Sequence, residues 1–211
     1  MVRAGVKSKI NRAYKISTVI SPVNYRLFAF SVFFLLSFVP GCARVTSLSN
    51  VDYVDLQRFM GRWYVIGGIP TFLEKGAHNP TETYQIGNDG AIETTFTFNE
   101  GSFDGDVKSY HPKGFIVDKQ SNAIWEMQFL WPFRADYRII YLDEQYANTV
   151  IGREKRDYLW IMSREPRIEK LVWEDILVLV ESAGYSLDQI YRFPHEQDTQ
   201  KDIHSLTEPG S

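Results

Sequence analysis

The chain contains a single cysteine, Cys42, among 211 residues. One cysteine cannot close a disulfide within the chain, and no other cysteine or histidine lies near it in sequence to complete a metal site. The four histidines, His78, His111, His195 and His204, are far apart and show no paired metal-ligand spacing. We therefore expect no metal and no cofactor, which leaves covalent modification as the role to consider for Cys42.

Local motifs of hydrolytic enzymes are also missing. The sequence has no Gly-x-Ser-x-Gly nucleophile elbow and no His-Glu-x-x-His zinc motif. These absences predict a protein that is not an enzyme. A lipid-modifying enzyme stays open as an alternative, because residues that are distant in sequence can converge in a fold.

Acidic residues are absent from the first 41 positions, which carry six Lys and Arg. An apolar run over 27–39 follows this basic region and ends at Pro40 and Gly41. This order is typical of a secretory signal peptide, and the run is shorter than the roughly 20 residues that a transmembrane helix needs. We therefore predict that residues 1–41 are removed.

The sequence "VPGC" that ends in Cys42 resembles the bacterial lipobox. This resemblance implies that Cys42 becomes the lipid-modified N-terminus. Ala43 follows where an aspartate would resemble the inner-membrane retention signal, so we expect a protein anchored to the outer membrane and facing the periplasm. An ordinary signal peptide with an incidental cysteine is the alternative.

The chain that remains, 42–211, is acidic. It has 17 Lys and Arg against 26 Asp and Glu, a net charge of −9. This charge disfavours nucleic acid as a partner and a broad electrostatic attachment to anionic lipid. The length fits one domain.

Period-two alternation of apolar and polar residues dominates this part of the chain and predicts eight strands. Turn signals separate them, with "NDG" at 88–90 as the strongest. The predicted strands cover 62–69, 81–87, 91–99, 106–117, 123–130, 137–142, 148–152 and 157–163. Eight consecutive strands with short links favour an all-β, antiparallel up-and-down barrel, which leaves no exposed sheet edge. A two-sheet sandwich fits the same spacing.

One segment, 168–183, departs from this alternation. Its apolar residues recur at steps of three and four, and Gly184 follows as a stop signal, so we predict a helix that packs on the outside of the barrel. We assign 42–52 as a tether, 53–195 as the barrel domain with its helix, and 196–211 as a disordered tail.

Several residues resemble the motifs of the lipocalin family. Gly61 and Trp63 stand at the start of the first predicted strand, and Arg164 stands at the end of the last, in "YLWIMSREP". By this resemblance Trp63 plugs the closed end of the barrel and Arg164 packs on it in a cation–π contact. Tyr146 keeps the tyrosine of the remaining motif, although its two preceding residues differ.

Together with the lipobox, these motifs resemble the bacterial outer-membrane branch of the lipocalins. The resemblance covers about 51–194 and implies binding of fatty acids or lysophospholipids, for envelope maintenance, storage or stress response, and a possible homodimer. A ligand-free scaffold lipoprotein for envelope assembly is the alternative.

Alternation predicts which side chains face into the barrel. These candidates for the ligand site are Phe96, Phe98, Trp125, Met127, Phe129, Tyr137, Ile139, Tyr141, Tyr158, Trp160 and Met162. They could fill a solid core or line a cavity, and the resemblance favours the cavity. Strand direction places the basic residues Arg134, Arg153, Lys155 and Arg156 at the open rim, where we expect one or more of them to bind a carboxylate or phosphate head group.

Overall fold

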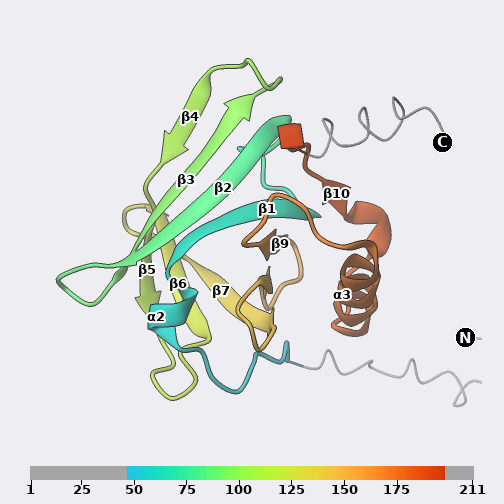
Figure 1. The fold of residues 1–211 in the computed structure, drawn as a ribbon. Coiled ribbons are helices and arrows are strands. Elements are labelled where there is room, and N and C mark those ends of the chain that lie inside the picture. The colour runs from blue at the N-terminus through green and yellow to red at the C-terminus, as the bar shows by residue number, and fades with distance from the viewer. Residues whose placement is uncertain (1–46, 198–211) are drawn as a thin grey trace, which may run out of the picture. The chain divides into compact units, whose positions relative to one another are not determined.

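The protein, described for residues 47–197 by a computed structural model, folds into an antiparallel β-barrel with one long helix outside it (Figure 1). The strands are β1 (Gly61–Ile69), β2 (Ala77–Ile86), β3 (Ile92–Glu100), β4 (Val107–Tyr110), β5 (Lys113–Ile116), β6 (Ile124–Leu130), β7 (Phe133–Leu142), β8 (Asn148–Gly152) and β9 (Leu159–Ser163). The predicted signal peptide, Cys42 and most of the predicted tail lie outside the described residues.

The barrel closes because β9 pairs with β1. Their register runs from Tyr64 opposite Ser163 to Ile69 opposite Leu159, and each of the other strands pairs with its neighbour along the chain. β4 and β5 pair with successive parts of β3 and together act as one bent strand. The predicted eight-stranded up-and-down barrel is therefore confirmed, and the sandwich alternative is wrong.

The predicted strand over 106–117 is interrupted at His111 and Pro112. Proline has no N–H to give to a ladder, and here its carbonyl accepts a hydrogen bond from Thr94 N at 3.1 Å while the chain bends. Three strand starts differ from prediction by more than one residue. β2 begins at Ala77 and β7 at Phe133, both earlier than predicted, whereas β9 begins at Leu159, later than predicted.

The helix α3 (Lys170–Ser182) lies against the outer wall of the barrel, as predicted, with Ile176 and Val180 buried. These residues join an outer core with Leu159 and Ile161 from β9. The chain then forms a short 3₁₀ helix, η1 (Leu187–Gln189), and β10 (Tyr191–Arg192), which pairs with β1. Within 47–197, no helix is both long enough and apolar enough to cross a bilayer.

Two β-bulges change which side chains enter the barrel. The register shifts between Val65 and Gly67 in β1 and between Ile139 and Tyr141 in β7. An extra residue in a strand reverses the alternation beyond it. As a result, Tyr141 packs in the outer core beside α3 and not in the barrel, where alternation had placed it.

Candidate functional site

The closed end of the barrel is built around Trp63, which is fully buried. The short helix α2 (Leu56–Phe59) crosses this end, with the Asp55 carboxylate accepting hydrogen bonds from Gln57 N and Arg58 N as its N-cap. Trp63 Nε1 donates to Phe59 O at 2.9 Å, and the two rings are in contact. The indole therefore fixes α2 onto the first strand.

Arg164 covers Trp63 from the solvent side, with its guanidinium carbon 3.8 Å from the ring centroid. Its Nη1 donates to Arg62 O at 2.8 Å. Its Nη2 donates to three carbonyls at the end of α2, those of Arg58, Phe59 and Met60, at 2.8–3.0 Å. The planar guanidinium of Arg164 thus donates to carbonyls that have no hydrogen-bond partner within the helix. Burial lowers the pKa of Arg164 to about 10.

Gly61 and Tyr146 complete this end. Gly61 has a φ of 96°, a conformation that favours glycine, and a Cβ there would lie 3.4 Å from Arg164 Nη1. The Tyr146 hydroxyl accepts a hydrogen bond from Asp55 N at 2.8 Å, and its ring lies under the Arg58 guanidinium. The four motif residues named from the sequence are therefore gathered at the closed end.

The barrel contains a cavity of about 500 Å³. Its wall is mostly apolar, as in lipid and small-molecule sites generally. The lining residues come from the β1–β2 loop (Thr71, Phe72, Leu73, Glu74), from the strands and the β4–β5 bend (Glu82, Thr94, Phe96, Tyr110, His111, Pro112, Met127, Phe129, Leu130, Ala135, Asp136, Tyr137), and from the β8–β9 side (Arg153, Tyr158, Trp160).

Six of the eleven predicted pocket residues line this cavity: Phe96, Met127, Phe129, Tyr137, Tyr158 and Trp160. Four others, Phe98, Trp125, Ile139 and Met162, are buried in the barrel core but do not line the cavity. Tyr141 is the exception described above. Trp125, Ile139 and Met162 fill the barrel toward the closed end, whereas Phe98 packs against Phe96 and Tyr110 farther toward the open end.

The four predicted rim residues do not act as one group. Arg134 lies on the outer wall, where it pairs with Glu126 at 3.1 Å and stacks on the Phe115 ring. Arg156 donates from Nε to Ala183 O at 2.9 Å, at the C-terminal end of α3. Lys155 is exposed and does not line the cavity. Of the four, only Arg153 lines the cavity, so it is the one placed to meet a head group there.

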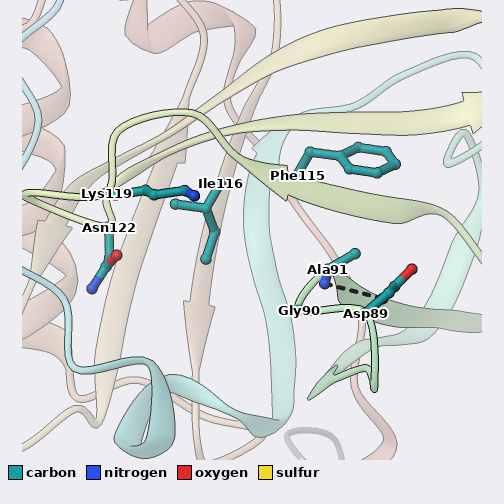
Figure 2. A pocket seen from close by; sticks show the side chains of 7 residues that line it. All are labelled: Asp89, Gly90, Ala91, Phe115, Ile116, Lys119 and Asn122. Carbon is teal, nitrogen blue, oxygen red and sulfur yellow. Dashed lines mark hydrogen bonds between the residues drawn. The ribbon is translucent and has the colours of Figure 1, made fainter.

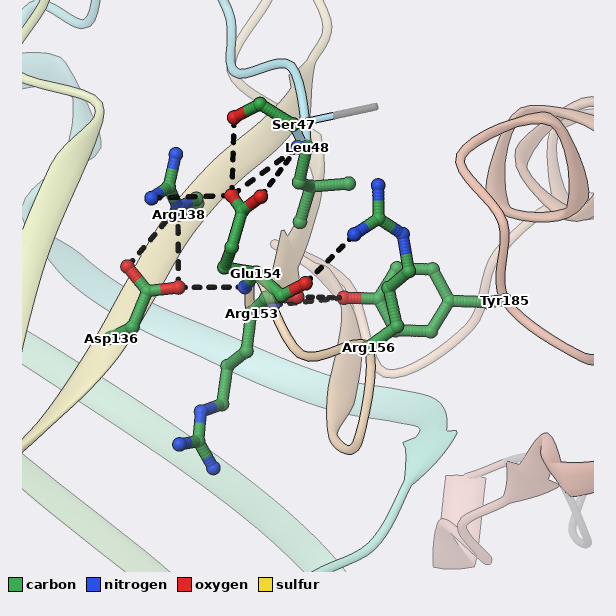
Figure 3. Close-up of polar contacts among 8 residues, drawn as sticks. All are labelled: Ser47, Leu48, Asp136, Arg138, Arg153, Glu154, Arg156 and Tyr185. Carbon is green, nitrogen blue, oxygen red and sulfur yellow. Dashed lines mark hydrogen bonds and ion pairs between the residues drawn. The ribbon is translucent and has the colours of Figure 1, made fainter. Parts of the chain in front are cut away.

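Arg153 is held in place by its neighbours (Figure 3). Its backbone N donates to the Tyr185 hydroxyl at 2.8 Å, and the Tyr185 hydroxyl donates to its carbonyl at 3.1 Å. The next residue, Glu154, donates from its backbone N to Asp136 and pairs through its carboxylate with Arg138. These contacts fix the loop between β8 and β9.

The Arg153 side chain itself is only partly engaged. It is 17% exposed, and its Nη1 pairs with Asp157 at 3.3 Å. Its Nε is buried and, within the described residues, has no hydrogen-bond partner. A buried donor without a partner is costly, so Arg153 is the side chain of the predicted rim best prepared to bind an acceptor on a ligand.

Two buried carboxyl groups also face the cavity, and the sequence pattern did not single them out. Glu74 accepts hydrogen bonds from Thr71 N and Trp160 Nε1, both at 2.6 Å. Glu82 accepts a hydrogen bond from the Tyr84 hydroxyl, which is itself 2.5 Å from the Tyr137 hydroxyl. These groups give the apolar cavity a polar wall.

Burial governs the protonation of both carboxyls. Desolvation raises the pKa of Glu82 to about 8, with the Glu74 charge adding to the effect. Desolvation also raises the pKa of Glu74, although its two N–H donors oppose the shift. Burial and the charge of Glu82 raise the pKa of Tyr137 well above its ordinary value. Glu82 is therefore mostly un-ionised at neutral pH.

A weak sequence signal for Glu82 does exist. In "TETYQ" it shares its strand face with Tyr84, two residues on, while Thr81 and Thr83 face the other way. Side chains that face the inside of the barrel are mostly apolar, so an acidic residue among them can mark a functional site.

A second hollow, of about 380 Å³, lies outside the barrel between the β2–β3 turn and β5 (Figure 2). Two of its polar side chains, Asp89 and Asn122, are already paired, and Lys119 is exposed at its edge. Asp89 accepts hydrogen bonds from Ala91 N and Lys113 Nζ, and Asn122 donates to Val54 O. The barrel cavity is the better candidate site, because its polar atoms still have bonding capacity. Within 47–197, no group of three or more His, Cys, Asp or Glu side chains is placed to hold a metal ion.

Comparisons with known proteins agree with this geometry. Residues 54–195 match the family model described as a lipocalin-like domain. The outer membrane lipoprotein Blc of Citrobacter freundii is 28% identical over 72% of this chain and 87% of that protein. Temperature-induced lipocalin-1 of Arabidopsis thaliana is 28% identical over 75% of this chain and 88% of its own.

Among solved structures, insecticyanin from the tobacco hornworm Manduca sexta superposes with a TM-score of 0.58 at 12% identity, covering 72% of this chain and 87% of its own. This likeness shows the fold alone. The family match covers more than half of the chain, from α2 through the barrel to the end of β10. The chain therefore belongs to the lipocalin family, with Blc-type bacterial lipoproteins among its relatives.

Proposed function

We propose that this protein binds a single-chain lipid, a fatty acid or a lysophospholipid, in its barrel cavity and does so as a binding protein, not as an enzyme. The observation that carries the proposal is the apolar cavity of about 500 Å³ lined by Arg153, whose buried Nε has no hydrogen-bond partner among residues 47–197. The apolar lining suits an acyl chain, and Arg153 suits a carboxylate or phosphate.

The energetics favour a single-chain ligand. Burying a 16-carbon chain contributes roughly 12 kcal/mol at about 0.8 kcal/mol per methylene, before the costs of ordering the ligand. A bilayer offers a similar gain to the same chain. A lipid therefore leaves the membrane for the cavity only if it fits the bilayer poorly, as a lysophospholipid does, or if its head group is recognised.

The second part of the proposal concerns location. The relatives named outer membrane lipoproteins and the lipobox-like sequence around Cys42 support an acyl anchor on Cys42 in the outer membrane, with the barrel in the periplasm. Storage or delivery of lipid for envelope maintenance would follow from this placement.

Native mass spectrometry of protein purified from the bacterial envelope tests the ligand directly. We expect one single-chain lipid per barrel, and the same spectrum gives the oligomeric state, including any homodimer. A protein that stays ligand-free after incubation with fatty acids and lysophospholipids would favour the scaffold alternative.

Charge reversal separates Arg153 from the other predicted rim residues. Arg153→Glu is expected to weaken lysophospholipid binding at least tenfold. Arg134→Glu is the matched control, because that side chain lies on the outer wall. Equal affinities of the two variants would remove the head-group role of Arg153.

A further inference from the structure

The inner part of the cavity carries hydrogen-bonding groups that a plain acyl chain would leave unsatisfied. Thr94, on β3, is 3% exposed, lines the cavity, and its Oγ1 has no hydrogen-bond partner in the part of the chain that the structure describes. Thr94 lies opposite Tyr84 in the β2–β3 ladder, two residues from Phe96, which lies opposite Glu82. A buried hydroxyl and a buried carboxyl therefore share one region of the wall.

The hydrogen bonds of Glu82 determine where its proton can go. Oε2 accepts the hydrogen bond from Tyr84, while Oε1 has no partner among residues 47–197. When the Tyr84 hydroxyl donates to Oε2, as it does in the structure, the proton of a neutral carboxyl lies on Oε1. Because Glu82 lines the cavity, that O–H is available to an acceptor on a ligand.

Glu74 cannot take this role. Both of its oxygens already accept hydrogen bonds from N–H groups, which donate and cannot accept, so its contacts favour the ionised form. Glu82 instead contacts a hydroxyl, which tolerates either protonation state. The two carboxyl groups are therefore suited to different roles in one cavity, Glu74 as a structural partner of Thr71 and Trp160 with both oxygens engaged, and Glu82 as a neutral donor.

We infer that the cavity selects an acyl ligand that carries an uncharged oxygen function, a carbonyl or hydroxyl, along its chain, and that Glu82 is the specificity-determining residue that donates a hydrogen bond to it. This inference rests on the proposed function, and it adds the chemistry of the chain to that of the head group. Thr94 supplies a second hydrogen-bonding group beside Glu82. An unmodified chain would bury both groups without partners, which is how a polar site rejects a ligand that lacks the matching atom.

Ionisation of Glu82 turns this donor into an acceptor, so preference for a carbonyl should be lost at high pH. The titratable or charged groups that share the cavity with Glu82, or contact it, are Glu74, Tyr84, Tyr110, His111, Asp136, Tyr137, Arg153 and Tyr158. β3 and β6 contribute only uncharged side chains to the lining. Of these groups, Glu74 is the one whose charge shifts the pKa of Glu82.

The test compares octadecanoic acid with a series of oxo-octadecanoic acids that differ in the position of the carbonyl. Both ligands have the same head group, so the ratio of their dissociation constants isolates the chain. The protein is the chain 42–211 with Cys42→Ser, so that no acyl anchor competes for the cavity. Isothermal titration calorimetry at pH 6.5 and pH 9.5 gives the ratio.

We expect at least a tenfold preference for one oxo isomer at pH 6.5 and its loss at pH 9.5. With a pKa of about 8, the neutral fraction of Glu82 falls about 30-fold between these pH values. Glu82→Gln keeps an N–H donor that does not titrate, so it should keep the preference at both pH values. Glu82→Leu should lose it at both, and Glu93→Gln, exposed on the barrel surface, should behave as the parent protein does.

Two results would overturn the inference: equal binding of all the acids at pH 6.5 by the parent protein, or the same loss with pH in Glu82→Gln as in the parent. In both cases the proposed function would stand, since the acids still bind. Failure of the parent protein and every variant to bind any of the acids, or a lysophospholipid added as a further ligand, would instead overturn the proposed function along with the inference.

Discussion

Replacing Glu82 with glutamine should stabilise the protein, and the gain should grow as pH rises from 5 to 8. Glu82 has a pKa of about 8 in the folded protein against an ordinary value of 4.5. Between these two values the unfolded chain releases the proton and the folded protein keeps it. The free energy of unfolding of the parent protein therefore falls as pH rises, and it changes no further above the folded pKa.

The size of this effect follows from the pKa difference. Each pKa unit is worth about 1.4 kcal/mol, so Glu82 costs the folded state roughly 3 kcal/mol at pH 7 and at most about 5 kcal/mol above pH 8. Glutamine keeps the oxygen that accepts from Tyr84 but has no proton to lose. The free energy of unfolding of the variant should therefore not show this fall with rising pH.

Urea unfolding at a series of pH values from 5 to 8.5 measures the slope for both proteins without ligand. Glu93→Gln, an exposed carboxyl on β3, is the control and should follow the parent protein. If the stability difference between Glu82→Gln and the parent stays constant within about 0.5 kcal/mol across this range, Glu82 ionises as an exposed acid does and the reasoning is wrong.

Three further predictions concern the ends and walls of the barrel. Arg164→Ala should lower the free energy of unfolding, measured in urea, by about 3 kcal/mol, because it removes four hydrogen bonds and the contact with Trp63. A loss under 1 kcal/mol would contradict this role. Gly67→Ala should lower stability by about 1–3 kcal/mol, since its Cβ would lie 2.6 Å from the Trp173 ring, and an unchanged thermal midpoint would show that α3 moves freely. Cys42→Ser should release the protein from the membrane fraction on envelope fractionation, and retention there would argue against the acyl anchor.

The closed end of the barrel was predictable because its residues are marked locally. Gly61 and Trp63 stand two positions apart, and Arg164 ends the last strand, so the family pattern is visible without knowledge of the fold. The geometry adds what Arg164 does there, which is to bind the carbonyls at the end of α2.

The direction of the basic side chains at the rim could not be predicted in the same way. Strand direction placed Arg134 and Arg153 at the same end of the barrel, yet one side chain lies on the outer wall and the other faces the cavity. Arg134 lies in β7, which begins earlier than predicted, and its side chain points outward to Glu126. Arg153 lies in the loop after β8, where no alternation fixes the direction of a side chain, and it pairs with Asp157.

The barrel and its outer helix could be predicted from the sequence, because period-two alternation, turn residues and apolar residues at steps of three and four are local signals of strands and helices. The bulges that turn Tyr141 outward, the direction of each rim arginine and the burial of Glu82 depend instead on contacts between distant parts of the chain. The protonation of Glu82 depends on Tyr84, Tyr137 and Glu74. Glu74 and Tyr137 come close to Glu82 only when the strands close into a barrel, so no local pattern in the sequence could show this.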